Sequence, residues 1–312
     1  MYIRFWGVRG SVPTPLTNAE LVVKIKTVLK KALEAGLTND SQIPAFIRNL
    51  PKGLLMTAGG DSVCVEIRTG DQLIILDAGT GIRRLGFNLM QKAMGNPIKA
   101  HILISHTHWD HICGIPFFIP GYNPRNNFLV YSTYSDMKDR LSCQQDSKHF
   151  PVSLGPAFEF IRIEERSAFR IGNVEIEAIP LNHPGKSFGY RIASGSKTVV
   201  YATDSEYKNL SAGALKPFTD FFRKADLLIY DAQYTMLENV EKEDWGHSNV
   251  FTGIDMAIEA DVKKLAFIHH EPAYNDLELW EILQKANEYV KINQPEKKLQ
   301  LYLAFEGARI RI

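Results

Sequence analysis

Ser105-His106-Thr107-His108-Trp109-Asp110-His111 is the stretch of this sequence that decides both the fold and the chemistry. Three imidazoles and one carboxylate fall within residues 106–111. Imidazole and carboxylate are common ligands of zinc, manganese and iron, and this density suits two metal ions held side by side better than one. The alternative is a polar turn with ordinary surface histidines. Histidine is too scarce in the rest of the chain for that reading to be favoured.

The run before this cluster, Ala100-His101-Ile102-Leu103-Ile104, is apolar and partly β-branched. It predicts a buried strand that ends where the cluster begins, which is a usual place for chemistry in an α/β protein. If the chain stays extended beyond the strand, the side chains of His106, His108 and Asp110 point to one side. His111 then points to the other side.

Further histidines and aspartates follow other predicted strands. His183 follows a strand at 174–180, and Asp204 follows one at 198–202. Asp231 and the pair His269-His270 come after the apolar runs 227–230 and 265–268. One histidine at a strand end is usually structural, whereas several such residues indicate a shared site.

The alternation of elements predicts an α/β layered architecture in a single domain, residues 1–312. Residues 17–57 interrupt the pattern as a helical insertion. Thr17 and Glu20 have the spacing of a capping box, and apolar residues then recur at helical spacing up to Gly36. A second short helix is expected from Pro44 to Leu50. The insertion either packs on the body or serves as a lid or a dimer contact.

Bulk composition narrows the class of protein. The 312 residues carry a formal net charge of +1, so no global basic field favours extended nucleic acid as a partner. Three scattered cysteines, an odd number, indicate a reducing compartment, and no apolar run approaches membrane-spanning length. The first residues read as a strand and not as a secretion signal. We therefore expect a cytoplasmic protein that does not associate with membranes.

His106-x-His108-x-Asp110-His111 with later strand-end ligands resembles the metallo-β-lactamase superfamily, whose fold is an αββα sandwich. Within it, the chain is similar to the branch of ribonuclease Z and cyclic nucleotide phosphodiesterases. The supporting segments are residues 59–62, 76–81, 183–190, 245–248 and 268–270. Together they are specific, although each one alone is weak.

The resemblance implies a ligand set for two divalent metal ions, zinc first and manganese second. One ion would take His106, His108 and His183, the other Asp110, His111 and His269, with Asp204 bridging both. His269 is preferred to His270 because it directly follows its strand. The resemblance also implies catalytic roles for Asp110, which would steer the proton of the attacking water, and for His247, which would protonate the leaving oxygen. Asp231 or Glu206 would orient His247.

The resemblance also implies the substrate, a 3′,5′-cyclic nucleotide opened to a nucleoside monophosphate. Bacterial ribonuclease Z enzymes usually carry a long arm between the residues matching His183 and Asp204, where this chain has twenty residues. Trp109 stands where the RNA-processing enzymes commonly have glycine. It could stack on a base or pack as core. The tentative substrate contacts are Trp109, Phe117, Lys186 and His270, with Phe118 and Tyr122 completing a base pocket.

Alternative functions are ribonuclease Z-like processing of transfer RNA 3′ ends and hydrolysis of another cyclic phosphodiester. A non-hydrolytic di-iron redox or sensor protein is disfavoured, because those relatives resemble His-x-Glu-x-Asp-His and this chain has His108 in place of the glutamate. A homodimer is expected from the resemblance, with the helix at 18–35 as a candidate interface. Arg9 would either reach an anionic substrate or pair with a carboxylate.

Overall fold

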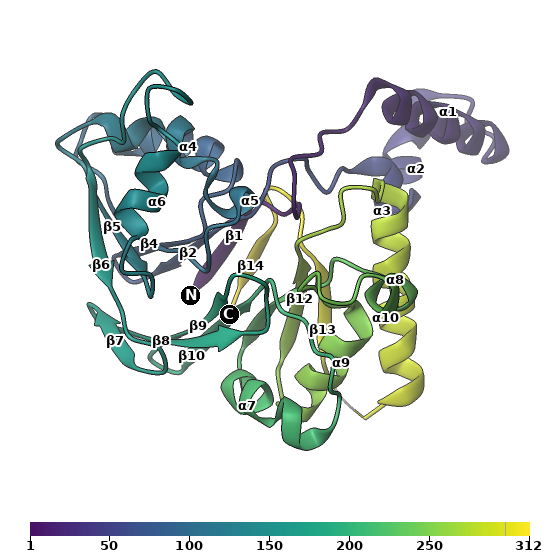
Figure 1. Cartoon of the computed structure of the whole chain (residues 1–312). Helices are drawn as coiled ribbons and strands as arrows, with labels where there is room; N and C mark the ends of the chain where they lie inside the picture. Colours follow the sequence, from purple (N-terminus) through teal and green to yellow (C-terminus); the bar gives the residue numbers. More distant parts are fainter. Residues whose placement is uncertain (297) are drawn as a thin grey trace.

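Two seven-stranded sheets face each other in the computed structural model, which describes residues 1–296 and 298–312 (Figure 1). The first sheet has the order β14-β1-β2-β3-β4-β5-β6 and the second the order β13-β12-β11-β10-β9-β8-β7. The first sheet contains β1 (Tyr2–Gly7), β2 (Cys64–Thr69), β3 (Gln72–Leu76), β4 (Lys99–Leu103), β5 (Asn127–Ser132), β6 (Phe158–Arg162) and β14 (Arg309–Arg311). The second contains β7 (Ala168–Ile171), β8 (Val174–Leu181), β9 (Ser187–Ser194), β10 (Lys197–Ala202), β11 (Leu227–Asp231), β12 (Lys264–Ile268) and β13 (Gln300–Leu303).

Helices cover the outer face of each sheet (Figure 1). The first sheet is covered by α4 (Gly81–Ala93), α5 (Trp109–Ile112), α6 (Met137–Cys143) and the short 3-10 helices η2 (Ile115–Phe117) and η3 (Ile119–Tyr122). The second is covered by α7 (Ala212–Phe222), α9 (Val250–Glu259) and α10 (Asp276–Asn293), with α8 (Met236–Glu241) nearby. The αββα sandwich expected from the sequence is confirmed.

The period-2 alternation of the strands explains this layering. In β3, Ile74 and Leu76 belong to the core between the two sheets, whereas Leu73 and Ile75 belong to the core under α4. Successive side chains of a strand point to opposite faces, so a strand that is apolar at every position is buried on both sides. The continuous apolar runs of this sequence therefore become the inner strands of two packed sheets.

The carboxyl ends of several strands meet at one edge of the sandwich. Strands β3 to β6 are parallel, and β10 to β13 are parallel in the second sheet. Two hydrogen bonds tie the end of β4 to β9: the Phe188 N–H donates to the Ser105 carbonyl, and the Tyr190 hydroxyl donates to that of Ile104. Loops from both sheets therefore converge at this edge.

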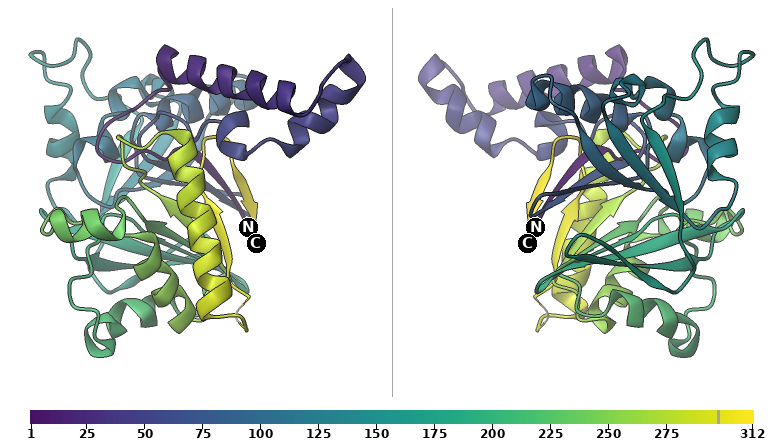
Figure 2. Two further views of the ribbon diagram at one scale, coloured as in Figure 1. Left: turned by 90° about the vertical axis from the view of Figure 1, so that its right-hand side faces the viewer. Right: turned by 90° about the vertical axis from the view of Figure 1, so that its left-hand side faces the viewer.

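Residues 17–57 form a projecting arm that lies over one end of the body (Figure 2). The arm contains α1 (Asn18–Glu34), η1 (Asp40–Gln42), α2 (Ile43–Asn49) and α3 (Lys52–Leu55). The capping box of Thr17 and Glu20 is present, and Gly36 takes a positive φ of 65° just beyond α1. The short helix α3 was not foreseen from the sequence. Among the described residues, no helix has the length and apolar character needed to span a bilayer.

Candidate metal centre

The histidine cluster combines an extended segment with one helical turn. His108 is the last extended residue, with φ −62° and ψ 151°, and it precedes α5. The His111 N–H donates to the His108 carbonyl at 3.0 Å, and the Cys113 N–H donates to that of Trp109 at 2.7 Å. The expectation of a continued extended strand is wrong beyond His108. Because of the turn, Asp110 and His111 point to the same centre and not to opposite sides.

The first group of converging side chains is His106, His108, His183 and Asp204. His183 Nε2 lies 3.0 Å from His108 Nδ1 and 3.7 Å from Asp204 Oδ2. His106 Nε2 lies 3.5 Å from the same oxygen. His106 Nε2 is buried and has no hydrogen-bond partner among the described residues. A buried ring nitrogen without a partner is costly unless something else binds it.

The second group is Asp110, His111 and His269. His269 Nε2 lies 3.0 Å from Asp110 Oδ2 and 3.3 Å from His111 Nε2. Asp204 connects the two groups, because its Oδ1 lies 3.3 Å from His111 Nε2 and 3.4 Å from His269 Nε2, while its Oδ2 faces the first group. The structure thus brings together all seven residues proposed as ligands from the sequence.

The other ring nitrogens of these histidines fix their tautomers. The Nδ1 atoms of His111, His183 and His269 face acceptors at 2.8, 2.9 and 2.8 Å, namely an Asp77 oxygen, the Gly246 carbonyl and the Gln233 amide oxygen. When these rings are neutral, as metal ligands must be, Nδ1 therefore carries the proton and the lone pair of each Nε2 faces the centre. Lone pairs that converge from both groups, with one carboxylate between them, fit two divalent metal ions.

The electrostatics of the cluster also favour cations. Burial lowers the pKa of His106 well below its usual value, so this ring is neutral, as a ligand must be. Burial alone would lower the pKa of His269, but Asp204 and Asp110 more than offset it and raise the pKa to about 9. Burial would raise the pKa of Asp204, yet the surrounding imidazoles hold it well below the usual range. The carboxylates thus create a negative centre that attracts protons or metal ions.

Asp77, which directly follows β3, forms hydrogen bonds to residues that surround this centre. Its Oδ1 accepts the Ser105 N–H, and its Oδ2 accepts the Ser105 hydroxyl, the His111 Nδ1–H and the Tyr201 hydroxyl at 2.6 to 2.8 Å. The side chain is fully buried. These contacts orient Ser105 and His111 and so support the proposed metal ligands.

His247 lies at the rim of the same centre. Its Nδ1 faces Asp231 Oδ2 at 2.9 Å, and its ring stacks on His269 with centroids 4.8 Å apart. Asp231, and not Glu206, therefore orients His247. Glu206 instead accepts a hydrogen bond from the Asp244 N–H. With Nδ1 bonded to a carboxylate, Nε2 of His247 is left to act on a bound molecule.

The centre opens to the surface through a cavity of about 470 Å³. Its lining residues are Ser11, Thr107, His108, Trp109, Asp110, Asp204, His247 and His269.

A family model described as the beta-lactamase superfamily domain matches residues 72–270 of the chain. The chain belongs to the metallo-β-lactamase superfamily. The family resemblance seen in the sequence motifs is confirmed.

Known members of the superfamily resemble the chain in sequence and fold. A ribonuclease Z from Ignicoccus hospitalis is 23% identical over 248 residues, which are 65% of this chain and 80% of the relative. The metallo-β-lactamase fold protein YhfI from Bacillus subtilis superposes with a TM-score of 0.64 at 18% identity, covering 99% of this chain and 98% of YhfI. Human tRNase Z, short form, gives a TM-score of 0.62 at 16% identity, covering 100% and 99% of the two chains.

Other residues singled out from the sequence lie elsewhere in this metallo-β-lactamase fold. His270 is buried, and its Nε2 donates to the Ala304 carbonyl at 2.7 Å, so the expected contact with substrate is wrong. Phe118 is fully buried against Phe128, so its ring does not line the expected base pocket. Arg9 takes neither expected role, because its buried guanidinium donates to the backbone carbonyls of residues 59, 271 and 274. These side chains point into the body because the segments that carry them pack against it.

Three of the expected substrate contacts lie at the surface. Trp109 is 83% exposed and lines the mouth of the cavity, so the reading of this residue as core is wrong. Lys186 is exposed on the loop after His183 and has a positive φ of 69°. Phe117 is exposed, and its ring packs edge-on against Phe150. All three remain predictions as substrate contacts.

Two supporting residues were missed in the sequence. The Ser11 N–H donates to Asp110 Oδ2 at 2.8 Å, and Gln233 binds both the His269 ring and the Ser11 hydroxyl. Gly10 allows this close approach, because a Cβ there would lie 2.3 Å from the His269 ring. The Gly10-Ser11 pair after β1 was a visible turn signal, but its contact with residues 110 and 269 arises through the fold alone.

Proposed function

We propose that this protein hydrolyses phosphodiester bonds with two metal ions. The observation that carries the proposal is the arrangement of seven ligand side chains in two groups that share Asp204, with His247 beside them in the same cavity. Such a pair of metal ions would supply an activated water and stabilise the charge that develops on phosphorus. The comparisons support the proposal, because the curated relative from Ignicoccus hospitalis is named ribonuclease Z.

The chain's own residues supply the proton transfers and the positioning. His247 protonates the departing oxygen from Nε2, while Asp231 holds its Nδ1. Asp110 orients the attacking water through a carboxylate whose Oδ2 is fixed by the Ser11 N–H and faces His269 Nε2. A ring of buried hydrogen bonds around Asp77 keeps the ligand side chains rigid.

We propose zinc as the resident metal, with manganese as the alternative. Imidazole nitrogens dominate the first group, which has three histidines and one carboxylate oxygen. Nitrogen-rich sets suit zinc, whereas additional carboxylate oxygens, as in the second group, are also compatible with manganese. Elemental analysis of the purified protein, with metal-to-protein ratios, tests this assignment.

The substrate proposed first is a 3′,5′-cyclic nucleotide. The residues between His183 and Asp204 form mostly β9 and β10, which pair directly within the second sheet. This segment therefore has no long insertion of the kind expected for bacterial ribonuclease Z. Trp109 offers an exposed ring at the mouth of the cavity, on which a base can stack. A compact cyclic phosphate needs no extended basic surface, which agrees with the net charge of +1.

Ribonuclease Z-like cleavage of transfer RNA 3′ ends is the second candidate. The names of the relatives favour it over the cyclic nucleotide, because the relative from Ignicoccus hospitalis is among several named ribonuclease Z and a superposing structure is human tRNase Z. Hydrolysis of another cyclic phosphodiester uses the same groups. The two candidates differ in the size of the substrate that the mouth of the cavity must admit.

A direct comparison of substrates tests the proposal. Metal-loaded protein is assayed with purine and pyrimidine 3′,5′-cyclic nucleotides and with precursor transfer RNA, and the Asp110→Ala variant serves as the control for contaminating activity. We expect turnover of at least one cyclic nucleotide to its nucleoside monophosphate. If the protein cleaves only the precursor transfer RNA, the proposed substrate is transfer RNA and not a cyclic nucleotide. Lack of activity on any phosphodiester would overturn the proposal itself.

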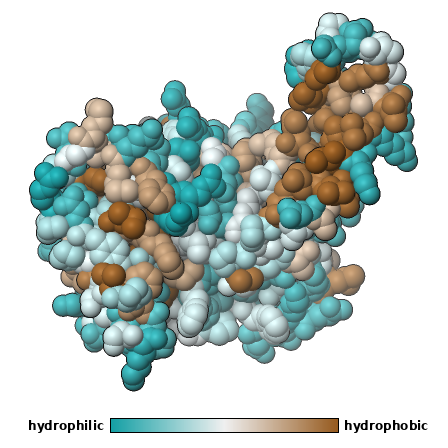
Figure 3. Space-filling model, turned by 90° about the horizontal axis from the view of Figure 1, so that it is seen from above, coloured by the Kyte–Doolittle hydropathy of each residue, from teal (hydrophilic) through white to brown (hydrophobic). Residues whose placement is uncertain are grey.

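We also propose that the protein forms a homodimer through the arm, residues 17–57. Its helix α1 has no buried residue, although Leu21, Ile25, Leu29 and Leu33 repeat every fourth position. Their exposed fractions rise along the helix from 44% to 82%. The apolar side chains gather on the projecting arm (Figure 3). A helix of this length is marginal by itself in water, and a second copy of the same stripe would bury it.

The oligomeric state tests the role of the arm. Leu29→Glu places a charge in the middle of the stripe, and Leu237→Glu places the same charge at an exposed leucine of α8, outside the arm. In analytical ultracentrifugation, we expect the wild type and Leu237→Glu to sediment as dimers and Leu29→Glu as a monomer. A monomeric wild type, or a dimer that survives Leu29→Glu, would rule out this interface.

A further inference from the structure

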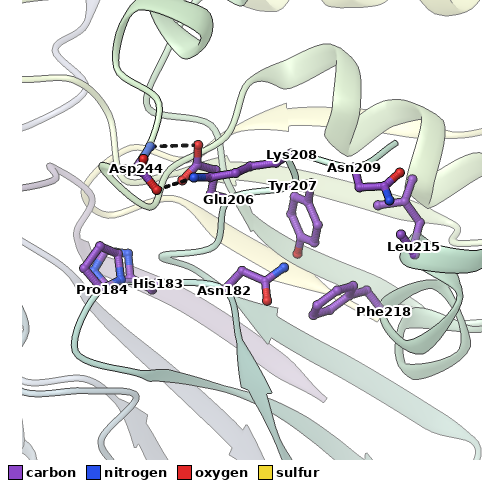
Figure 4. Close-up of a pocket in the computed structure, with 11 residues that line it drawn as sticks. Asn182, His183, Pro184, Glu206, Tyr207, Lys208, Asn209, Leu215, Phe218 and Asp244 are labelled. Carbon is purple, nitrogen blue, oxygen red and sulfur yellow. Dashed lines mark hydrogen bonds and ion pairs between the residues drawn. The ribbon is translucent and has the colours of Figure 1, made fainter. Parts of the chain in front are cut away.

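A second cavity of about 480 Å³ adjoins the proposed metal centre at His183 (Figure 4). The proposed ligand His183 lines it, together with its two neighbours Asn182 and Pro184. The segment that follows Asp204 contributes Tyr207, and the loop before His247 contributes Asp244. Helix α7 contributes Leu215 and Phe218, which lie across the cavity from His183 (Figure 4). Three segments that carry residues of the proposed metal centre thus also contribute to the wall of this cavity, and His183 belongs to both.

The walls combine flat apolar surface with amide groups. The rings of Tyr207 and Phe218 meet edge-on with centroids 5.0 Å apart, and Leu215 lies beside them. The side-chain amides of Asn182 and Asn209 add donors and acceptors. A cavity of this volume, apolar with a few polar groups, is typical of sites for small molecules.

One polar group of this cavity lacks a partner. Tyr207 is 8% exposed, and among the described residues neither its hydroxyl nor the nearby hydroxyl of Ser205 makes a well-aligned hydrogen bond. Figure 4 shows this hydroxyl turned toward Asn182. A buried hydroxyl without a partner is unfavourable, so a ligand that offers it a hydrogen bond gains free energy there.

The charges of the walls exclude phosphate-bearing ligands. Lys208 is paired with Asp244, and Glu206 accepts the Asp244 N–H, so the single cation is already neutralised beside two carboxylates. A phosphate would meet net negative charge. A neutral, flat heterocycle fits the aromatic rings, and asparagine amides can pair with the polar edge of a nucleobase.

We propose that this cavity is a regulatory site for an uncharged nucleobase or nucleoside. The ligand binds next to residues 182–184, 206–209 and 244, which are continuous with the segments that position His183, Asp204 and His247. Occupancy therefore changes the placement of those side chains and with it the affinity of the centre for metal. By linkage, metal binding changes the affinity for the nucleoside by the same factor. The proposal does not depend on which bond the metal centre hydrolyses.

Binding of four probes, adenosine, guanosine, cytidine and uridine, tests the first part by titration calorimetry on the metal-loaded protein. Leu215→Trp fills the cavity and Asn182→Ala removes an amide, while Leu237→Ala on the exposed face of α8 is the matched control. We expect saturable binding of at least one nucleoside, weakened tenfold or more by both cavity variants and unchanged by the control. Circular dichroism confirms that the variants are folded.

Two results would overturn the site. One is that none of the four nucleosides binds. The other is that binding persists in Leu215→Trp but is lost in Trp109→Ala, which would place the nucleoside in the metal cavity. The coupling is measured as the chelator concentration that removes half of the bound metal. We expect the bound nucleoside to shift this midpoint about fivefold or more, and an unchanged midpoint would overturn the regulatory role.

Discussion

Replacing Asp231 by asparagine tests the assignment of His247 as the proton donor. Asp231 is fully buried, and its Oδ2 lies 2.9 Å from His247 Nδ1. Asparagine has the same shape and keeps a dipole at this position, but it removes the charge that stabilises a protonated ring. The variant therefore changes the electrostatics of His247 with little change in packing.

The expected size of the effect follows from the distance. Two unit charges about 3 Å apart interact by roughly 6 kcal/mol at an effective dielectric constant of about 20. An amide dipole retains part of this interaction, so we take the loss as about 3 kcal/mol, in the range found when one preorganised catalytic hydrogen-bond donor is removed. A loss of about 3 kcal/mol corresponds to a decrease in kcat of about 10²-fold.

The assay compares two leaving groups. A cyclic nucleotide releases a strongly basic ribose oxygen that needs a proton, whereas an aryl phosphodiester releases a nitrophenolate that hardly does. We expect Asp231→Asn to lose about 10²-fold with the former and only a few-fold with the latter. Asp226→Asn is the matched control, because Asp226 precedes the other end of β11 and binds Lys263 and the Thr198 N–H there.

Three results would refute this reasoning. Equal losses with both leaving groups would mean that His247 does not act as an acid. A loss of metal content in Asp231→Asn would show that Asp231 supports the ligands, since its Oδ1 lies 4.0 Å from His269 Nδ1. An equal loss in Asp226→Asn would indicate a general effect of removing a buried carboxylate from this strand.

Other substitutions test the remaining assignments. Asp110→Ala should abolish hydrolysis, with wild-type turnover as the contrary result, because it removes both a proposed ligand and the group that orients the water. Trp109→Ala should change the free energy of unfolding by less than about 0.5 kcal/mol, because the ring is exposed. It should raise the KM for a cyclic nucleotide about tenfold, because the stacking contact with the base is lost. An unchanged KM would mean that Trp109 does not contact the substrate. Gly10→Ala should displace the His269 ring and reduce the bound metal, as measured by elemental analysis. The control is Gly213→Ala in α7, where an added Cβ meets nothing within 4 Å, and it should leave the metal content unchanged. Full metal content in Gly10→Ala would show that the backbone around residue 10 shifts and the His269 ring keeps its place.

Local sequence predicted much of the fold because its signals are local. The apolar runs of β4 and β12 and the capping box of α1 depend on neighbouring residues and were found at the expected places. The helical turn of α5 was missed, because a run of four residues is too short to show helical periodicity. The environments of His270 and Phe118 were also misjudged, since burial against distant segments leaves no mark on adjacent residues.

The sequence by itself determined which residue types could form the proposed metal centre. Six residues supply four of the seven proposed ligands, and the ends of three strands supply His183, Asp204 and His269. Only the tertiary structure decided how these side chains are supported and what surrounds them. The contact of Asp231 with His247, the contact of Ser11 with Asp110 and the cavity beside His183 all join segments far apart in the chain. Such contacts arise when two sheets pack and bring their strand ends to one edge, and sequence spacing contains no measure of that distance.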